Sequence, residues 1–313
     1  MSRIHEALKL AEQERRSRQV SERPAPLPER EIALPQMSET GKAPGPARGV
    51  GTIDSPIPVP EYSPEPASIE SLIASCRQPA WNPDGKTMLF SQEDNRQYKF
   101  EVFRTLRSRL YRLRDLMPLR TLLITSTLPA EGKSFIAANL SQAIAQQHGR
   151  RVLLIDADLR MPRLHTLLGA PQCPGLTEYL RGEVDEISAI QRGPRNGFYF
   201  LSCGDTVPDP VELIANGRMR GLIERLKHAF DWIVLDSPPM APVSDASLLA
   251  DMCDGALLVV RSAATPFDLA QKACAEFKGT PLLGVVLNGI SRNSSYGGYY
   301  HSYYGPDSEK SKE

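Results

Sequence analysis

The feature that most constrains the fold of this 313-residue sequence is a series of short apolar runs separated by stretches of helical character. Near-continuous apolar runs are typical of strands that are buried on both faces of a parallel sheet and joined by helical crossovers. The sequence therefore predicts one α/β domain with a doubly wound, mostly parallel sheet and right-handed crossovers. The runs are TLLIT (121–125), VLLI (152–155), FYFL (198–201), WIVL (232–235), ALLVV (256–260) and LLGVVL (282–287).

The segment after the first run has the pattern of a phosphate-binding loop. STLPAEGKS, residues 126–134, leads into FIAANLSQAIAQ, which is predicted to be a helix. In such a loop the backbone N–H groups and the helix N-terminus hold phosphate, Lys133 reaches the β- and γ-phosphates, and Ser134 binds Mg²⁺. The segment is therefore interpreted as a Walker A motif of a P-loop NTPase fold, although Thr127 stands where the standard motif has its first glycine.

Three aspartates follow apolar runs and support a nucleotide site. WIVLDSPP places Asp236 after one run, and LLIDADLR places Asp156 and Asp158 after another. One such aspartate often only caps a helix or a loop. Three of them at the carboxyl ends of strands indicate a ligand site, because open α/β sheets bind ligands at that edge. Asp236 is expected to hold Mg²⁺ through water as a Walker B carboxylate, whereas Arg160 could either neutralise charge or cap a helix.

The rest of the chain predicts three further segments. Residues 1–20 form a short amphipathic helix, with an apolar stripe on one side. Residues 21–80 are so rich in proline that they are expected to be a mostly disordered linker. The P-loop domain is assigned to 81–290, and its first helix, from Tyr98 to Arg112, turns Phe103, Leu106 and Leu110 inward. Residues 291–313 form a flexible tail that includes SYGGYYHSYYG.

Composition excludes several classes of function. Lys and Arg balance Asp and Glu at 37 each, so no global charge favours a nucleic-acid partner. No apolar run is long enough to span a bilayer and no signal region follows the first residues, so the chain is expected in the cytoplasm. The five cysteines lack C-x-x-C spacing, which fits reduced packing residues better than a metal site or a disulfide framework. The five histidines are scattered, so no catalytic metal other than Mg²⁺ is expected.

Three segments of the chain resemble, in their sequence order, the motifs of the bacterial tyrosine kinases (BY-kinases) of capsule and exopolysaccharide assembly. The segments are STLPAEGKS, LLIDADLR and WIVLDSPP. The P-loop domains of that family carry Walker A, a second Asp-x-Asp motif called Walker A′, and Walker B. PDPVELI (208–214) resembles the family's proline-asparagine-proline stretch, with Asp209 in place of asparagine. The opening SRIHEALK resembles the exopolysaccharide subgroup found near exosortase systems, and the likeness covers roughly 95–305.

The resemblance implies an ATP-dependent protein-tyrosine autokinase that acts on the tail of a neighbouring subunit and regulates exopolysaccharide polymerisation and export. The implied phosphorylation sites are Tyr296, Tyr299, Tyr300, Tyr303 and Tyr304. The implied partners are further copies of the chain in a ring, an inner-membrane chain-length-determinant protein that activates the kinase, and a tyrosine phosphatase. The chain is then expected in the cytoplasm, held peripherally at the inner membrane by a protein partner.

The resemblance also assigns roles to individual residues. Lys133 neutralises the phosphates, Asp156 accepts the phenol proton, and Ser134, Asp158 and Asp236 hold Mg²⁺. The implied ATP contacts are Ala130, Glu131, Gly132, Lys133, Ser134 and Phe135. Asn288, after the last apolar run, could contact the adenine or serve as an ordinary turn residue. In EVFRTLRSRL, the E-x-x-R-x-x-R pattern places Glu101, Arg104 and Arg107 on a helix that contacts the next subunit.

Two other interpretations stay open on sequence alone. A deviant-Walker switch ATPase of the partition type binds ATP to dimerise and phosphorylates nothing. Its K-G-G-x-G-K-[ST] motif has a lysine at the position of Leu128, which counts against it. The second is a pseudokinase scaffold with an adhesive tail. Eukaryotic-type kinases are excluded because the chain has neither H-R-D nor D-F-G.

Overall fold

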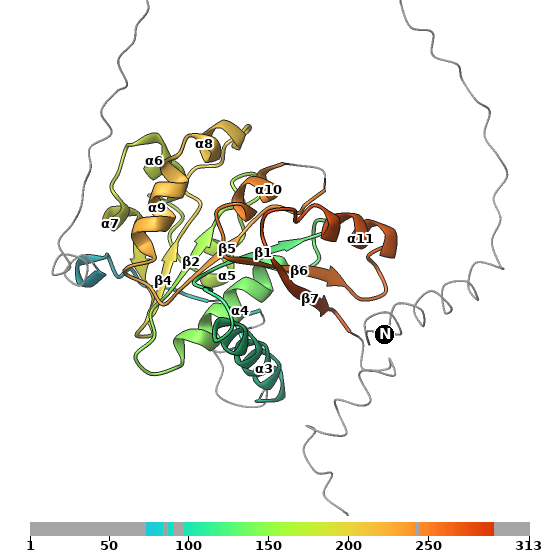
Figure 1. Cartoon of the computed structure of the whole chain (residues 1–313). Coiled ribbons are helices and arrows are strands. Elements are labelled where there is room, and N and C mark those ends of the chain that lie inside the picture. Colours follow the sequence, from blue (N-terminus) through green and yellow to red (C-terminus); the bar gives the residue numbers. More distant parts are fainter. Residues whose placement is uncertain (1–72, 84, 86, 90–96, 242–243, 291–313) are drawn as a thin grey trace, which may run out of the picture. The chain divides into compact units, whose positions relative to one another are not determined.

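Seven strands form one sheet in the order β3-β4-β2-β5-β1-β6-β7 (Figure 1). All neighbouring strands are parallel except β3 and β4, which are antiparallel. The computed structural model describes residues 73–83, 85, 87–89, 97–241 and 244–290. The strands are β1 (Thr121–Ser126), β2 (Val152–Asp156), β3 (Ile190–Arg192), β4 (Phe198–Leu201), β5 (Trp232–Asp236), β6 (Gly255–Arg261) and β7 (Leu282–Asn288).

Helices cover both faces of this sheet (Figure 1). Those of one face are α3 (Gln97–Arg114), α4 (Lys133–Ala145) and α5 (Leu164–Leu168). The opposite face carries α6 (Leu176–Arg181), α7 (Glu186–Ala189), α8 (Val211–Ala215) and α9 (Arg218–Leu226). Toward the β6 end lie α10 (Asp245–Ala250) and α11 (Phe267–Ala275).

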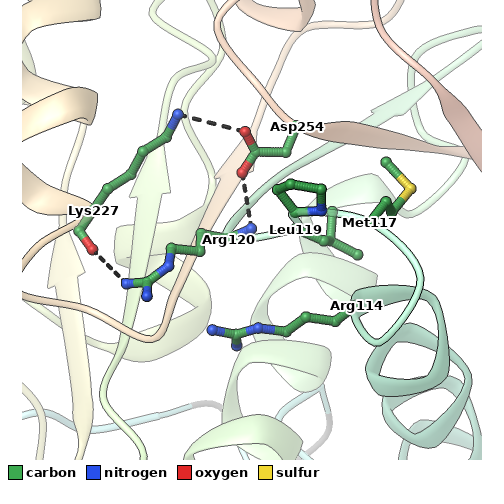
Figure 2. Close-up of a pocket in the computed structure, with 7 residues that line it drawn as sticks. Arg114, Met117, Leu119, Arg120, Lys227 and Asp254 are labelled. Atoms are coloured by element: carbon green, nitrogen blue, oxygen red, sulfur yellow. Dashed lines mark hydrogen bonds and ion pairs between the residues drawn. The ribbon is translucent and has the colours of Figure 1, made fainter.

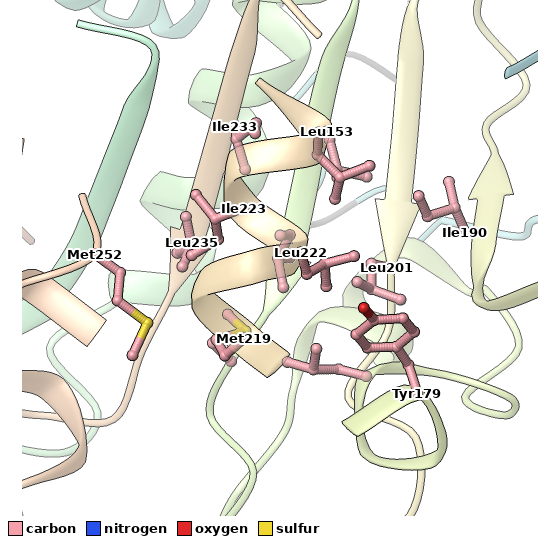
Figure 3. Close-up of a cluster of buried hydrophobic side chains, with 14 of the residues drawn as sticks. Leu153, Tyr179, Ile190, Leu201, Met219, Leu222, Ile223, Ile233, Leu235 and Met252 are labelled. Carbon is pink, nitrogen blue, oxygen red and sulfur yellow. The ribbon is translucent and has the colours of Figure 1, made fainter. Parts of the chain in front are cut away.

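The alternation of side chains along each strand explains why the apolar runs are continuous. In β1, Leu122 and Ile124 enter the core beneath α4, while Leu123 enters the core beneath α9. Figure 3 shows the second core, in which Met219, Leu222 and Ile223 of α9 pack toward the sheet. Because both faces are covered, every residue of β1, β2, β4 and β5 is buried.

The structure confirms the predicted fold class and all six predicted strands. It also contains β3, which the sequence did not predict, since three residues are too few to show a period. In α3, Phe103 and Leu110 are buried and Leu106 packs against the same core, as expected. None of the helices in the described ranges has the length and hydropathy needed to cross a bilayer.

The packed region begins earlier than the domain boundary expected at residue 81. Ile73 and Cys76, which the sequence places in the linker, are buried in the α9-side core. Arg77 forms a parallel bridge with Gln191 of β3, and its carbonyl accepts a hydrogen bond from the N–H of Arg192 at 2.8 Å. The predicted 1–20 helix, most of the 21–80 linker and the 291–313 tail lie outside the described residues.

Candidate active site

The Walker A segment joins β1 directly to α4. Gly132, the residue before α4, has φ +96°, in the left-handed region that favours glycine. A Cβ at this position would lie 2.1 Å from Nδ2 of Asn288, so a larger residue would be strained in its backbone and would displace the Asn288 amide. The loop therefore leads directly into the N-terminus of α4, the place where the predicted motif would bind phosphate.

Side chains brace this loop, largely from the ends of β6 and β7. The Glu131 carboxylate accepts the N–H of Leu128 at 2.8 Å and the hydroxyl of Thr265. The Asn288 amide donates to the Glu131 carbonyl at 2.8 Å, and the Arg261 guanidinium donates to the Ala130 carbonyl at 3.1 Å. The predicted ATP contacts of Glu131 and Asn288 therefore stay predictions, while both side chains have structural roles in the loop. The sequence gives no signal for Thr265 or Arg261.

Two of the predicted aspartates are neighbours at the carboxyl edge of the sheet. Asp156 and Asp236 end β2 and β5 and are direct partners in the strand register. Both are fully buried. One oxygen of Asp156 accepts the N–H of Leu164 at 3.0 Å. The other oxygen of Asp156 and both oxygens of Asp236 have no hydrogen-bond partner among the described residues.

Lys133 supplies positive charge beside these carboxylates. Its ammonium lies 2.8 Å from Asp158, whose other oxygen accepts the N–H of Met161 at 3.0 Å. Burial opposes the charge of Lys133, but Asp236 and Asp158 outweigh it, so the pKa of Lys133 lies above its usual value. The lysine therefore stays charged, and the structure brings together Lys133, Asp156, Asp158 and Asp236, as the sequence predicted.

The negative charge in this cluster exceeds the positive charge. Burial raises the pKa of Asp236 to about 6. The charge of Lys133 and the nearby Ser134 side chain both act to lower this pKa, although Ser134 does not complete a hydrogen bond to the carboxylate. Burial and then the charge of Asp236 raise the pKa of Asp156 well above its usual range. Unpartnered carboxylate oxygens are the hard ligands that Mg²⁺ prefers, so these residues fit a bound Mg²⁺–nucleotide.

Arg160 pairs with a residue that the sequence had not singled out. Its guanidinium contacts both carboxylate oxygens of Asp245, at 2.7 and 3.1 Å, and the Pro208 carbonyl at 3.2 Å. Asp245 is fully buried in the first turn of α10. The guanidinium therefore neutralises the charge of Asp245, and the pair ties the Walker A′ loop to the Pro208 loop and to α10.

The remaining predicted residues separate into three groups. Glu101 and Arg104 form an exposed ion pair of 2.7 Å on α3, whereas Arg107 donates to the Ala143 carbonyl of α4 at 2.6 Å. Phe135 is partly buried and turns its ring toward Phe103, with 5.9 Å between ring centres, so its predicted contact with ATP stays a prediction. The five predicted tail tyrosines lie outside the described residues.

Comparison with known proteins identifies a nucleotide-binding domain family and relatives that are named tyrosine-protein kinases. Residues 122–300 match the family model described as the CobQ/CobB/MinD/ParA nucleotide binding domain. The chain is 37% identical over 204 residues to the tyrosine-protein kinase YwqD of Bacillus subtilis, covering 64% of this chain and 85% of YwqD. It is 32% identical over 211 residues to a putative tyrosine-protein kinase in the cps region of Klebsiella pneumoniae, covering 66% of this chain but only 29% of that longer protein.

A solved structure agrees with these relatives. The kinase domain of Escherichia coli tyrosine kinase ETK superimposes with a TM-score of 0.62 and 31% sequence identity. The match covers 70% of this chain and 85% of that domain.

The left-handed backbone of Ala130 generates the first prediction. Its φ of +63° is unfavourable for a residue with a Cβ. We expect Ala130→Gly to raise the free energy of unfolding by about 1 kcal/mol, because glycine relieves this strain. Urea denaturation measures the change. Ala263→Gly, at φ +60°, should act in the same direction, whereas the neighbouring Ala264→Gly should destabilise. Equal destabilisation by all three would contradict the prediction.

The second prediction concerns the buried charge of Asp236. Because its folded pKa is near 6 and an unfolded aspartate titrates near 3.9, the folded state holds an extra proton between about pH 4 and 6. Stability should therefore fall as pH rises through that window and stay lower above it.

We expect Asp236→Asn to reduce this fall, while the buried Asp156, whose pKa is also raised, keeps a fall of its own. Without nucleotide, the variant should be about 1–3 kcal/mol more stable than the natural protein at pH 7.5 and no more stable near pH 4. Urea denaturation across the pH range measures it, and Asp251→Asn, at an exposed position, is the control. A variant less stable than the natural protein at pH 7.5 would show that the ionised carboxylate stabilises the fold.

Proposed function

Because this chain belongs to the CobQ/CobB/MinD/ParA nucleotide-binding domain family and, within it, to the bacterial tyrosine-protein kinases, we propose that it transfers the γ-phosphate of ATP to tyrosines of its own C-terminal segment. The observation that carries the proposal is the buried set of one lysine and three aspartates beside the Walker A loop. The acceptors are Tyr296, Tyr299, Tyr300, Tyr303 and Tyr304.

Each residue of the site has its own role in the proposed phosphoryl transfer. The loop N–H groups and the Lys133 ammonium hold the nucleotide phosphates. Ser134, Asp158 and Asp236 would hold Mg²⁺ directly or through water, and Mg²⁺ when bound neutralises charge on the β- and γ-phosphates. Asp156 accepts the proton of the incoming phenol, because its raised pKa makes it a stronger base than an ordinary aspartate. The apolar core on both sides keeps these groups in place.

The setting of the reaction is part of the same proposal. The chain regulates capsule or exopolysaccharide polymerisation and export, which fits a relative from a cps region. An inner-membrane chain-length-determinant protein activates it and keeps it peripherally at that membrane, and a tyrosine phosphatase reverses the modification. These partners are expected from the family rather than from contacts in the structure.

The proposal predicts where phosphate appears. We expect the protein with ATP and Mg²⁺ to acquire phosphate on the tail tyrosines, as mapped by mass spectrometry. Lys133→Met should lower the rate by a hundredfold or more, on the order of the loss seen when one charge clamp is removed. Lys272→Met, at an exposed position of α11, is the matched control and should leave the rate unchanged.

The activating partner belongs in this experiment. Its cytoplasmic segment should be added once identified, so that a missing activator is not mistaken for a missing activity. ATP binding without phosphotyrosine, with the activator present, would rule out the kinase and favour a partition-type switch ATPase. Full tail phosphorylation by Lys133→Met would refute the assignment of the site.

We also propose that the chain forms a head-to-tail ring in which α3 meets the next subunit, so that each tail enters a neighbour's site. Exposed Glu101 and Arg104 are the available part of the predicted contact, since Arg107 is bonded within its own domain. Tail phosphorylation adds nearly two negative charges per tyrosine, which should loosen the ring.

This assembly predicts a difference in sedimentation. The unphosphorylated protein should sediment as a large species, whereas the phosphorylated form and Arg104→Ala should sediment as smaller ones. Arg104→Ala is preferred to a change at Arg107, because it breaks no contact with α4. Arg112→Ala, an exposed arginine on the same helix, is the control. Identical monomer profiles for all samples at high concentration would refute the ring.

A further inference from the structure

A second polar pocket opens at the opposite edge of the sheet (Figure 2). It has a volume of about 370 Å³, and its polar lining comes from Arg114, Arg120, Lys227 and Asp254. Arg114 ends α3, Lys227 follows α9, and Arg120 and Asp254 each lie directly before a strand. The pocket therefore lies at the amino edge of the strands, about 20 Å from the nucleotide site across the six residues of β1.

Two of the cations in this pocket lack a carboxylate partner within the described part of the chain. The Arg120 guanidinium donates to the Lys227 carbonyl at 2.9 Å, and that of Arg114 donates to the Asp231 carbonyl at 3.1 Å. Both groups are thus held by neutral backbone acceptors. Their positions are fixed while their charges are left without a direct counterion.

The nearby carboxylates are already engaged. One oxygen of Asp254 accepts the N–H groups of Arg120 and Thr121, both at 2.8 Å, and the other lies 3.4 Å from the Lys227 ammonium. Lys227 also pairs with Glu224 at 2.9 Å. The Asp231 carboxylate accepts from the Arg150 guanidinium and the Arg151 N–H, each at 2.9 Å.

The electrostatic state of Arg114 reflects this arrangement. Burial and then the like charge of Arg120 lower its pKa, so the two guanidinium groups lie close enough to repel each other. The Arg114 guanidinium also lies 5.2 Å above the ring of Trp232. This contact holds the side chain over an apolar surface, where a charge is less screened than in open solvent.

We propose that this pocket binds a phosphate-type dianion, with the guanidinium groups of Arg114 and Arg120 as its direct ligands and the Lys227 ammonium beside them. Paired guanidinium groups suit this chemistry, because each offers a planar fork of donors to phosphate oxygens. The ligand is either inorganic phosphate or the phosphate of a phosphotyrosine. The volume is within the usual range for small-molecule sites and admits either one.

Trp232 provides a direct measurement of binding. The chain has two tryptophans, so Trp81→Phe leaves Trp232 as the single reporter under Arg114. The protein is saturated with ADP and Mg²⁺, which fills the nucleotide site and prevents transfer. Three probes are titrated at constant ionic strength: sodium phosphate, the peptide SYGGYYHSYYG with phosphate on the residue equivalent to Tyr300, and the same peptide unphosphorylated.

We expect a saturable change in Trp232 emission with sodium phosphate, with the phosphopeptide or with both, and no change with the unphosphorylated peptide. Arg120→Gln should weaken binding about tenfold or more, Arg120→Lys should restore part of it, and Arg112→Gln should have no effect. Thermal unfolding checks that each variant is folded. Tighter binding of the phosphopeptide identifies phosphotyrosine as the ligand, and equal or tighter binding of sodium phosphate identifies the free ion.

Two results would overturn the proposal. One is the absence of any saturable change with both sodium phosphate and the phosphopeptide. The other is equal binding by the Arg120→Gln and Arg112→Gln variants. Because no phosphate is transferred in this measurement, its failure would leave the proposed kinase activity untouched.

Discussion

The repulsion between the buried carboxylates at the ends of β2 and β5 is the main constraint on this structure. Asp156 and Asp236 are direct register partners, have no exposed surface, and lie near the ammonium of Lys133. Such a concentration of like charge is unfavourable in an apolar interior unless cations compensate it. The parallel pairing of β2 and β5, buried under helices on both faces, holds the two side chains side by side. Under the proposed function, bound Mg²⁺ and nucleotide would offset this cost, and the cluster would then favour the liganded state.

The phosphate loop depends on a second set of contacts, from the other half of the sheet. Glu131 closes the loop onto its own backbone and onto Thr265, while Asn288 packs against Gly132. The Walker A segment is therefore held between α4 and the carboxyl ends of β6 and β7. This bracing explains how Ala130 can remain in a left-handed conformation without glycine, because the surrounding bonds determine the backbone.

Much of this architecture could be predicted from the sequence, because strands buried on both faces leave continuous apolar runs and a phosphate loop has a local motif. Asp156, Asp158 and Asp236 could be predicted for the same reason, since each follows such a run. Contacts between distant segments leave no local pattern. Three such contacts could therefore not be predicted. They are the burial of Ile73 in the core, the pairing of Arg160 with Asp245, and the hydrogen bond of Arg107 within its own domain. The sequence also cannot show that a motif residue such as Glu131 directs its side chain to the loop instead of to a ligand.

The bond between Asn288 and the Glu131 carbonyl has a mechanical consequence. Asn288 is the last residue of β7, and the first tail tyrosine, Tyr296, follows it by about eight residues, a contour of at most roughly 28 Å. Force applied to the chain beyond this strand would act on Asn288, whose carbonyl accepts the N–H of Ser262 at 2.8 Å and whose side-chain amide donates to the backbone of the phosphate loop. Part of such a force would therefore reach the phosphate loop as well as the end of β6.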